Sequence, residues 1–561
     1  MARTPLMRSL VELAEDCRLA AATGVPVDAV QSERIARQAE RRALASGGIT
    51  RREFLAGTLA VGAAVTTLPF ASAAASAPTA RIAIIGGGIA GLTAALTLAD
   101  KGVPCTLYEA SARLGGRMHS DSAFFRGGTS FWANGQTSEP CGELIDTGHK
   151  LILSLANRYN LATDNLLQAE PNGSEDTYYF FGQYYPRSQA TNDFQAVHQA
   201  IQADLQSAPF PTLYSGYTPA GAALDHLSLY QWIETRVPGG HSSPMGMLLD
   251  VAYNIEYGAD TTEQSSLNLV YLLGFQPKPG NFSIFGLSDE KYHIVGGNQR
   301  LPAAIAADVA NRGTTIEPGW FMNAIARNPD GSYALSFGVG SSTKTVVADQ
   351  VILALPFAVL RNLDYGRAGF TDLKNTAIQQ LGAGKNGKLQ LQFDARYWDG
   401  TGAWPGTGDG NSYADTGYQN TWEVTRAQPG ATGILVDYTG GNIAGSLKPS
   451  VPYSDTGSNP QVAQYAKAFL RQIEPIYPGI SRHWTGLATL SAPFLDPNLD
   501  LAYSYWKVGQ YTAFSGYELV RQGNVHFAGE HCSINFQGFM EGGATEGRRA
   551  AGEVLGDLGV K

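Results

Sequence analysis

The chain has 561 residues, a mass of 59.7 kDa, a formal charge of -9 at pH 7 and a pI near 5.5. This length exceeds a single ordinary hydrophobic core, so two or three domains are expected. The acidic balance offers no basic face for a nucleic-acid backbone, no nucleic-acid motif is present, and the four cysteines lack the spacing of metal ligands, so neither a nucleic-acid partner nor a metal site is predicted.

Residues 1–77 are predicted to be an export leader. The sequence TRREFL, with Arg51 and Arg52 as its arginine pair, resembles a twin-arginine signal and precedes a mildly apolar stretch that ends in small residues near Ala73. Because this route carries proteins that have already folded, we expect an exported protein, periplasmic or secreted. If the leader is not functional, these residues stay attached as helices and the protein is cytoplasmic. No other window is apolar and long enough to span a bilayer.

Residues 78–120 predict the first part of a dinucleotide-binding domain. The apolar run Ile82–Ile85 is typical of a strand buried on both faces, and Gly86, Gly88 and Gly91 follow at the fingerprint spacing. Gly86 permits the tight turn, Gly88 lets the backbone approach a pyrophosphate, and Gly91 lets the next helix pack closely. Glu109 ends the second strand, where we expect it to accept hydrogen bonds from ribose hydroxyls, which argues against a 2′-phosphate.

The rest of the chain alternates between two kinds of segment. Strand and helix signals alternate again over residues 286–385 and 501–561, so the dinucleotide-binding domain is predicted to be discontinuous. Residues 121–285 show helical periodicity and many aromatic side chains, whereas residues 386–500 contain strands between Gly, Asn and Thr loops. These two segments are predicted to form a mixed α+β substrate domain with a helical lobe.

Residues 286–385 carry three local strand predictions. A strand at Tyr292 leads into a helix that ends before Gly313. A hairpin turns around residues 328–331, whose sequence is NPDG. The following sequence VVADQVILALP is predicted to be one buried strand.

Three further elements point to a flavin cofactor. The Gly-Gly-Arg at residues 115–117 brings a bidentate arginine to the pyrophosphate, which a nicotinamide dehydrogenase does not need. Ala528 and Gly529 allow a strand end to approach the cofactor, while Glu530 contacts its polar middle. Backbone N–H groups at the helix start Gly538–Gly543 can stabilise negative charge on a flavin ring that accepts a hydride.

The chain resembles a known family in three places. Arg113–Arg117, the sequence GELIDTGH from Gly142 and the sequence FAGEHCSINFQGFMEGG from Phe527 are similar to those of the flavin amine oxidase superfamily, which includes monoamine, polyamine and L-amino-acid oxidases. The resemblance covers nearly the whole chain after the leader. It implies FAD and an α/β fold, in which a discontinuous Rossmann-like, glutathione-reductase-like FAD-binding domain accompanies the mixed α+β substrate domain and its helical lobe.

The resemblance also implies which residues contact FAD. Met322 falls where a backbone group usually meets the adenine. Gln510 stands where some monoamine oxidases have the cysteine that bonds the flavin, so FAD is expected to be noncovalent. The predicted cofactor-binding residues are Gly86, Gly88, Ala90, Gly91, Glu109, Ala110, Gly116, Arg117, Glu143, Met322, Gly529, Glu530, Gly538 and Met540.

Lys388, Tyr511 and Phe539 are predicted by resemblance to be catalytic. Lys388 lies ten residues before Trp398, a spacing similar to that of the superfamily's active-site lysine. Its implied role is to hold a water against the reactive nitrogen of the flavin. Tyr511 and Phe539 match positions where two rings flank the substrate amine and attract a cation as it enters. A solvated lysine and core packing of the rings are the alternatives.

The resemblance implies oxidation of an amine. An alkyl amine with a pKa near 10 must be neutral before its lone pair can help to expel a hydride, and deprotonation at pH 7 costs about 4 kcal/mol. A desolvated site supplies part of this by disfavouring the ammonium form. Because the exported form with GELIDTGH is similar to bacterial L-amino-acid oxidases, we predict oxidation of L-amino acids to 2-oxo acids, ammonia and hydrogen peroxide, with molecular oxygen as acceptor.

Several alternatives stay open. Glu143 and Leu144 stand where many L-amino-acid oxidases have an arginine for the substrate carboxylate. Arg126 is then a candidate for that role, and Glu143 or Asp146 would favour a basic side chain or a polyamine. The other candidates are a monoamine or polyamine oxidase, a periplasmic amine dehydrogenase that passes electrons to a carrier protein, and a flavin-bound protein without turnover. A homo-oligomer is also compatible with the sequence.

Overall fold

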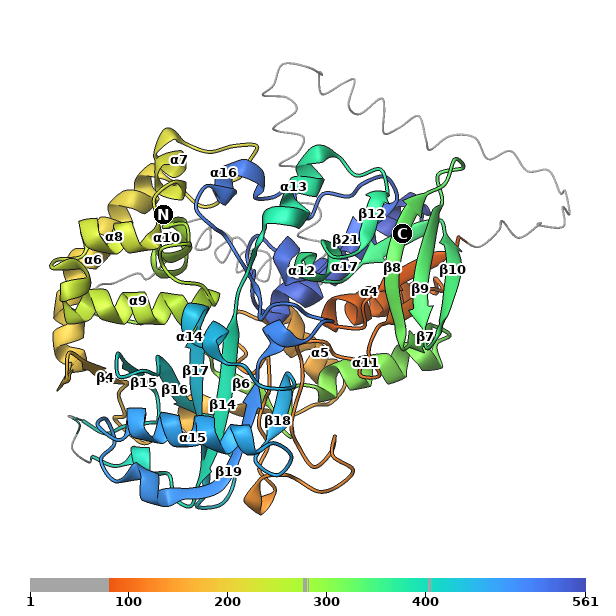
Figure 1. Ribbon diagram of the computed structural model, residues 1–561. Helices are drawn as coiled ribbons and strands as arrows, with labels where there is room; N and C mark the ends of the chain where they lie inside the picture. The colour runs from red at the N-terminus through yellow and green to blue at the C-terminus, as the bar shows by residue number, and fades with distance from the viewer. Residues whose placement is uncertain (1–79, 276–279, 281, 402–403, 405, 561) are drawn as a thin grey trace, which may run out of the picture. The chain divides into compact units, whose positions relative to one another are not determined.

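The computed structural model describes residues 80–275, 280, 282–401, 404 and 406–560 (Figure 1). The predicted leader lies outside these described residues, so the twin-arginine signal and export stay predictions. Among the helices that are described, none combines the length and the apolar character needed to cross a bilayer.

A parallel sheet of five strands brings together three separate parts of the chain. Its strand order is β21-β11-β1-β2-β7, and each neighbouring pair is parallel. The strands are β1 (Ile82–Ile85), β2 (Thr106–Glu109), β7 (Thr315–Pro318), β11 (Gln350–Leu353) and β21 (Val525–Phe527). The predicted α/β class with a discontinuous Rossmann-like sheet is confirmed.

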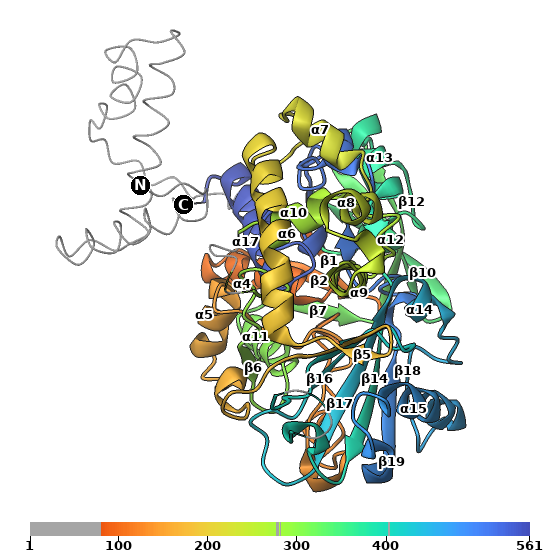
Figure 2. The same ribbon diagram turned by 90° about the vertical axis from the view of Figure 1, so that its left-hand side faces the viewer.

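Two different layers cover the faces of this sheet. Because side chains alternate along a strand, Ile82 and Ile84 pack on one side and Ala83 and Ile85 on the other. Helices cover the Ile84 side: α4 (Ile89–Asp100), α5 (Lys150–Arg158), α11 (Arg300–Asn311) and α17 (Met540–Asp557). A second sheet, ordered β10-β9-β8-β12, covers the Ile85 side: β8 (Trp320–Arg327), β9 (Tyr333–Val339), β10 (Ser342–Ala348) and β12 (Asp364–Arg367). Figure 2 shows α4, α5 and α11 on one side of β1, β2 and β7, with β10 and β12 on the other.

One of the local strand predictions needs correction. The sequence VVADQVILALP is divided at Asp349, whose carboxylate accepts hydrogen bonds from the backbone and guanidinium of Arg81. Its first half belongs to β10 and its second half to β11, in different sheets. The strand predicted at Tyr292 is confirmed as β6 (Tyr292–Ile294), and it pairs with β3 (Thr163–Asn165). Apolar patterning indicates a strand but not its partner.

An eight-stranded sheet, ordered β18-β19-β14-β17-β16-β15-β4-β5, forms the centre of the substrate-side region. Leu389 and Leu391 of its long strand β14 pack with α15 (Pro460–Ile473). Alternation therefore turns Lys388 and Gln390 to the opposite face. The strands are β4 (Thr177–Phe180), β5 (Gln183–Tyr184), β14 (Asn386–Phe393), β15 (Ser412–Ala414), β16 (Asn420–Glu423), β17 (Gly433–Gly440), β18 (Tyr453–Asp455) and β19 (Trp484–Ser491).

A helical lobe lies beside this sheet, as Figure 1 shows for α6 to α10. Its helices begin at well-defined caps: Ser228 and Gln231 form a reciprocal capping box, and the Thr218 and Ser243 hydroxyls each cap a helix that has proline in its first turn. The lobe contains α6 (Arg187–Ser207), α7 (Pro219–Asp225), α8 (Leu229–Arg236), α9 (Pro244–Tyr257), α10 (Leu267–Leu273) and α16 (Gln510–Phe514). The connecting elements are α12 (Phe357–Leu360), α13 (Asp372–Gln380), α14 (Gly441–Ser446), β13 (Gly382–Ala383) and β20 (Ser504–Tyr505).

Candidate active site

A cavity of about 1010 Å³ extends from the carboxyl ends of the parallel strands to the sheet face that carries Lys388. The elements of the parallel-sheet region line one end, and the eight-stranded sheet and α9 line the other. Every predicted site residue lines this cavity except Gly91 and Tyr511. The cavity thus joins the predicted cofactor-binding residues to the predicted catalytic lysine.

The glycine turn after β1 leaves room for a ligand at the start of α4. Gly86 has a φ of +107°, and a Cβ there would lie 2.6 Å from the carbonyl oxygen of Ala354. A Cβ at Gly91 would collide with the carbonyl oxygen of Gly86, so Gly91 lets α4 pack against the turn. A Cβ at Gly88 would meet only the Cα of Gly116, at 3.9 Å. The space beside Gly88 therefore fits a pyrophosphate at the helix N-terminus, where the helix dipole favours negative charge.

Glu109 ends β2 as predicted, and its side chain is buried. Its carboxylate accepts hydrogen bonds from the backbone N–H of Gly87 at 2.7 Å and from the backbone N–H and hydroxyl of Ser111 at 2.8 Å each. These contacts fix the carboxylate at the cavity wall with capacity for a further donor, because its two oxygens offer about four acceptor positions. The same end is lined by Ala90, Ala110, Met322, Gly529 and Met540.

Arg117 and Glu530 form an ion pair at this end of the cavity. Arg117 Nη1 lies 2.8 Å from Glu530 Oε1, and Glu530 Oε2 accepts from the Ser504 hydroxyl at 2.7 Å and the Gly538 backbone N–H at 2.9 Å. Burial acts to raise the pKa of Glu530, but the charge of Arg117 and these hydrogen bonds outweigh it and lower the pKa. Nε and Nη2 of Arg117 have no partner among the described residues, so both can donate to a phosphate.

His531 is a cavity residue that no sequence motif selected. It is buried next to Glu530, and neither of its ring nitrogens has a hydrogen-bond partner in the described part of the chain. Burial lowers the pKa of His531 to about 4, so its ring is neutral at pH 7. Since buried polar groups are normally hydrogen-bonded, these nitrogens fit a ligand that supplies the missing partner.

Lys388 is buried and faces the cavity beside Tyr438 of the neighbouring strand. Its Nζ forms an ion pair with Glu143 Oε2 at 2.7 Å and donates to the backbone carbonyl of Glu139 at 3.3 Å. The same Nζ lies 5.1 Å from the centre of the Trp422 ring. Because an ammonium group has three N–H donors, one donor is left for a molecule in the cavity.

Glu143, predicted to contact the cofactor, is held on a fixed backbone. Gln390 Nε2 donates to the carbonyl of Glu139 at 2.8 Å, and Ser491 Oγ donates to the next carbonyl at 2.7 Å. Asn298 Nδ2 donates to the carbonyl of Glu143 itself at 2.6 Å. The segment is thus fastened to the sheet on one side and to the turn before α11 on the other.

Both carboxylate oxygens of Glu143 are engaged by protein groups. Oε2 contacts Lys388, and Oε1 accepts a hydrogen bond from the indole N–H of Trp422 at 2.9 Å. We call the part of the cavity around Lys388, Glu143, Trp422, Tyr438 and Tyr503 the reacting end.

The part of the cavity away from the parallel sheet is rich in carboxyl groups. Glu256 and Glu290 line it, and neither side chain has a hydrogen-bond partner among the described residues. Burial, with Asp146 nearby, raises the pKa of Glu290 to about 7, and burial, with Glu290 nearby, raises the pKa of Glu256 well above its ordinary value. Burial and then the charge of Asp176 raise the pKa of Asp409 to about 7.

The arginines in this part of the cavity are already matched by carboxyl groups. Arg426 Nη1 lies 2.7 Å from Glu170 Oε1. Arg187 lies within the electrostatic reach of Asp176 and Asp409, which act to raise its pKa against burial. With Glu256 and Glu290 left over, this surface favours a positively charged ligand.

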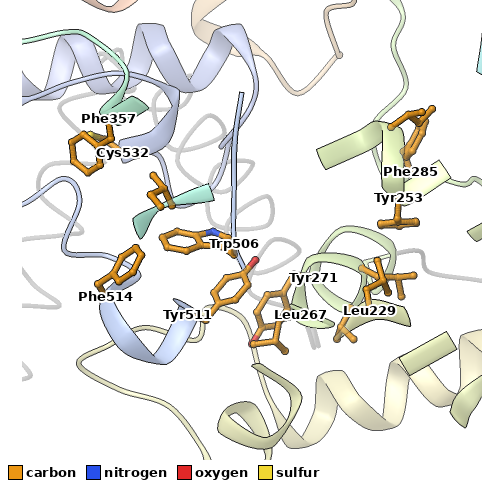
Figure 3. Close-up of a cluster of buried hydrophobic side chains, with 14 of the residues drawn as sticks. Leu229, Tyr253, Leu267, Tyr271, Phe285, Phe357, Trp506, Tyr511, Phe514 and Cys532 are labelled. Carbon is orange, nitrogen blue, oxygen red and sulfur yellow. The ribbon is translucent and has the colours of Figure 1, made fainter. Parts of the chain in front are cut away.

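The position predicted for Tyr511 is corrected by the structure. Its ring packs 5.1 Å from that of Trp506 and 5.8 Å from that of Tyr271, centre to centre, and its hydroxyl donates to Asn268 (Figure 3). Tyr511 is thus a core residue of the helical lobe. Tyr503, earlier in the same segment, lines the cavity instead, and its Oη lies 2.8 Å from that of Tyr438. Phe539 lines the cavity as predicted.

Two further expectations change with the structure. Gln510 is not a lining residue, and its amide donates to the carbonyl of Gln380 at 2.5 Å, so its identity says nothing about how FAD is attached. Arg126 is paired with Asp121 and Asp455 outside the cavity lining. It is therefore not available to a substrate carboxylate in this cavity.

Sequence reasoning missed the other residues of the reacting end. Asn420, Tyr438 and Lys388 are direct neighbours across β16, β17 and β14, and Trp422 lies two residues along on the same face. Alternation predicts the faces of a strand, but the neighbour of each strand is not visible in the sequence. Glu256 and Glu290 come from a helix and a loop, with no motif to mark them.

Comparison with known proteins places this geometry among flavoenzymes. A family model described as flavin containing amine oxidoreductase matches residues 89–555. The putrescine oxidase of Kocuria rosea is 25% identical over 85% of this chain and 95% of its own length, and the L-amino acid dehydrogenase of a Synechocystis species is 23% identical over 85% and 94%. The structure of cyclohexylamine oxidase from Brevibacterium oxydans superimposes with a TM-score of 0.70 at 19% identity, covering 86% of this chain and all of that one.

Proposed function

Because the chain belongs to the flavin-containing amine oxidoreductase family, we propose that it uses FAD to oxidise the amine-bearing carbon of a small amine that carries a second positive charge. The charge of the cavity carries this proposal. Glu256 and Glu290 line the cavity, and their side chains have no hydrogen-bond partner among the described residues. In contrast, the described lysine and arginines that line the cavity face carboxylates or donate to backbone carbonyls. A diamine or polyamine fits, because its second ammonium supplies the missing charge.

The described residues provide a place for each part of this chemistry. The N-terminus of α4 and Arg117 would hold the pyrophosphate, and Glu109 the ribose hydroxyls. When bound, FAD would accept the hydride that leaves the amine-bearing carbon, and with it the two electrons of the oxidation. The aromatic side chains around Lys388 exclude water, which disfavours the ammonium form of the reacting amine. The remaining Nζ donor of Lys388 would position a water. The imine product then reacts with water to give a carbonyl compound and ammonia.

We further propose that FAD is held noncovalently and that molecular oxygen is the final acceptor, with hydrogen peroxide as product. Cys141 lines the cavity, and burial raises the pKa of its thiol, which disfavours the thiolate needed for a flavin bond. Denaturation should therefore release free FAD. A peroxide assay in air, compared with an artificial acceptor under nitrogen, separates an oxidase from a dehydrogenase that serves a carrier protein.

L-amino acids, which were the substrates predicted from the sequence, are the second candidate substrates. One observation supports them: relatives of similar identity include the L-amino acid dehydrogenase. A basic amino acid would combine this candidate with the carboxyl-rich surface, because its side chain could meet Glu256 and Glu290.

The test is anaerobic mixing of the purified protein with putrescine, spermidine, L-lysine, L-leucine and benzylamine, while the flavin absorbance is followed. We expect putrescine and spermidine, which carry a second positive charge and no carboxylate, to bleach the flavin fastest and L-leucine to react slowest. Fast bleaching by L-leucine would favour the second candidate. A flavin that none of these compounds bleaches would remove the proposed function.

The pH dependence of substrate binding provides a second test. Carboxylates bind a cation better than carboxylic acids, and burial raises the pKa of Glu290 to about 7. The KM for putrescine should therefore fall as the pH rises from 6 to 8, because Glu290 and the similar Asp409 become charged. Glu290→Gln should raise KM and flatten this pH dependence. A KM that is independent of pH in the native protein would contradict this role.

A further inference from the structure

The ion pair between Glu143 and Lys388 determines the charge that a substrate meets at the reacting end. Both oxygens of Glu143 are used, by Lys388 Nζ at 2.7 Å and by the Trp422 indole N–H at 2.9 Å. Both members of the ion pair are buried, with side chains 8% and 5% exposed. In such a site, opposite charges that touch cancel each other for any third group, so the lysine offers a donor but little net positive charge.

From this geometry we propose that Glu143 is a specificity-determining residue: it withholds the charge of Lys388 from a substrate carboxylate, and so selects amines whose reacting carbon carries no carboxylate. This inference rests on the proposed function. It differs from the role predicted for Glu143 as a contact to the cofactor, because Glu143 acts here through Lys388.

The neighbouring cations strengthen this argument. Arg117 is committed to Glu530, and Arg113 donates to the backbone carbonyls of Leu114, Gly116 and Met118. A carboxylate on the reacting carbon would need a cation close to Lys388. Among the cavity-lining residues that the structure describes, Lys388 is the cation at this position, and Glu143 already neutralises it. A buried carboxylate without a partner is strongly disfavoured.

Hydrogen bonds hold the Glu143 segment in place, so the ion pair with Lys388 is expected to persist when a substrate enters. Hydrogen bonds from Gln390, Ser491 and Asn298 hold its backbone carbonyls. The carboxylate itself is held by Lys388 and Trp422, so a movement that releases Lys388 also breaks the hydrogen bond from Trp422. Glu143→Gln keeps the shape of the side chain and one acceptor oxygen, but it removes the negative charge and leaves Lys388 free to attract an anion.

Sodium benzoate is a suitable probe, because this small carboxylate undergoes no oxidation and its binding can be followed by the flavin difference spectrum of the holoprotein. We expect benzoate to bind about tenfold more tightly to E143Q than to the native protein, since one close charge contact has been gained. Glu290→Gln is the matched control: it removes a carboxyl group from the same cavity without releasing a cation, and it should bind benzoate as weakly as the native protein. The double variant E143Q/K388M should lose the gain.

Matched substrates test the same selection during turnover. Cadaverine and L-lysine differ only by the carboxylate on the reacting carbon. The native protein should have the higher kcat/KM for cadaverine, and E143Q should shift the ratio of the two values toward L-lysine by about tenfold. The Glu290→Gln control should change both substrates together.

Equal benzoate affinity in E143Q and the native protein, or an unchanged cadaverine to lysine ratio, would overturn the inference. If E143Q does not retain FAD, Glu143→Ala replaces it: this change also removes the negative charge and the 2.7 Å contact with Lys388, and an absence of any gain in benzoate binding would count against the inference equally. A native protein that oxidises neither cadaverine nor L-lysine would instead remove the proposed function, while the benzoate measurements would still report on Glu143.

Discussion

Lys388 and Lys374 are both buried lysines, and the contrast between their surroundings is instructive. Lys388 lies 2.7 Å from the carboxylate of Glu143 and lines the cavity. Lys374, in α13, is fully buried and donates to the backbone carbonyls of Tyr517 and Glu518 at 2.7 Å each. Without a carboxylate in contact, burial lowers the pKa of Lys374 to about 7.

The comparison teaches that burial alone does not identify a catalytic lysine. Lys374 is surrounded by protein groups, ties α13 to the loop before β21 and is not a lining residue of the cavity. Lys388 keeps one donor for a molecule that the chain itself does not provide. The functional lysine is therefore distinguished by an N–H donor that has no partner within the protein.

The largest expected effect comes from Lys388→Met. Removing the ammonium group should lower the rate of turnover by about a hundredfold or more, a typical cost for losing a group that handles a proton or a water. FAD content should change little, because methionine fills the space of the lysine's apolar stem, whereas thermal stability should fall, because Glu143 is left as a buried carboxylate without its cation. Stopped-flow reduction and reoxidation of the flavin would measure the effect, and unchanged rates in both half-reactions would remove Lys388 from the mechanism.

Lys374→Met should differ in activity: it should lose stability but keep its activity per folded molecule unchanged. Two buried carbonyls lose their donor, which costs about 2 kcal/mol in free energy of unfolding at pH 9. The folded-state pKa of Lys374 is lowered, so the unfolded chain binds the proton more tightly between about pH 7 and the ordinary lysine value, and native stability rises across that range. The stability difference between the native protein and the variant should therefore widen from pH 7 to pH 9. Urea unfolding at several pH values measures it, and a constant difference would contradict the environment described for Lys374.

Asp437 sharpens the comparison with the smallest effect, because it is a buried ionisable group with no charged partner. It lies opposite Leu389 on the sheet face that turns away from the cavity, and burial raises its pKa to about 8. The folded state therefore holds a proton that the unfolded chain releases above its ordinary pKa, so this group costs increasing stability from about pH 4 to pH 8. Asp437→Asn should be nearly neutral at pH 4 and should stabilise the protein increasingly toward pH 8. Equal melting temperatures of the variant and the native protein at pH 8 would be inconsistent with that cost.

Local sequence features predicted the parallel-sheet region well, because its chemistry is local. The run Ile82–Ile85, the glycines of the turn and Glu109 at the end of β2 each reflect a backbone or ribose requirement within one strand–turn–helix unit. The substrate-side region could not be read in the same way. Its cavity face depends on which strands of the eight-stranded sheet are neighbours, and that arrangement is set by contacts between distant segments.

Tyr503 and Tyr511 illustrate the same limit within the candidate site. Both are tyrosines of one segment near the C-terminus, and Tyr511 is buried whereas Tyr503 is partly buried. Tyr503 lines the cavity because it leads into β20, whose Ser504 bonds to Glu530, whereas Tyr511 sits on α16 and turns toward Trp506. A motif indicated which segment contributes to the site, but tertiary packing determines which of its tyrosine rings lines the cavity.

The order of the parallel sheet has a consequence for how the protein is made. β11 pairs with both β1 and β21, so the sheet that contains β1 is completed only when β21, one of the last strands, has been synthesised. While the chain is still on the ribosome, the glycine turn is present but lacks Glu530 and α17, and such distant pairings form slowly. We therefore expect cofactor uptake to follow the synthesis of β21, and a protein shortened before Val525 should be isolated without bound FAD even though its glycine turn is intact.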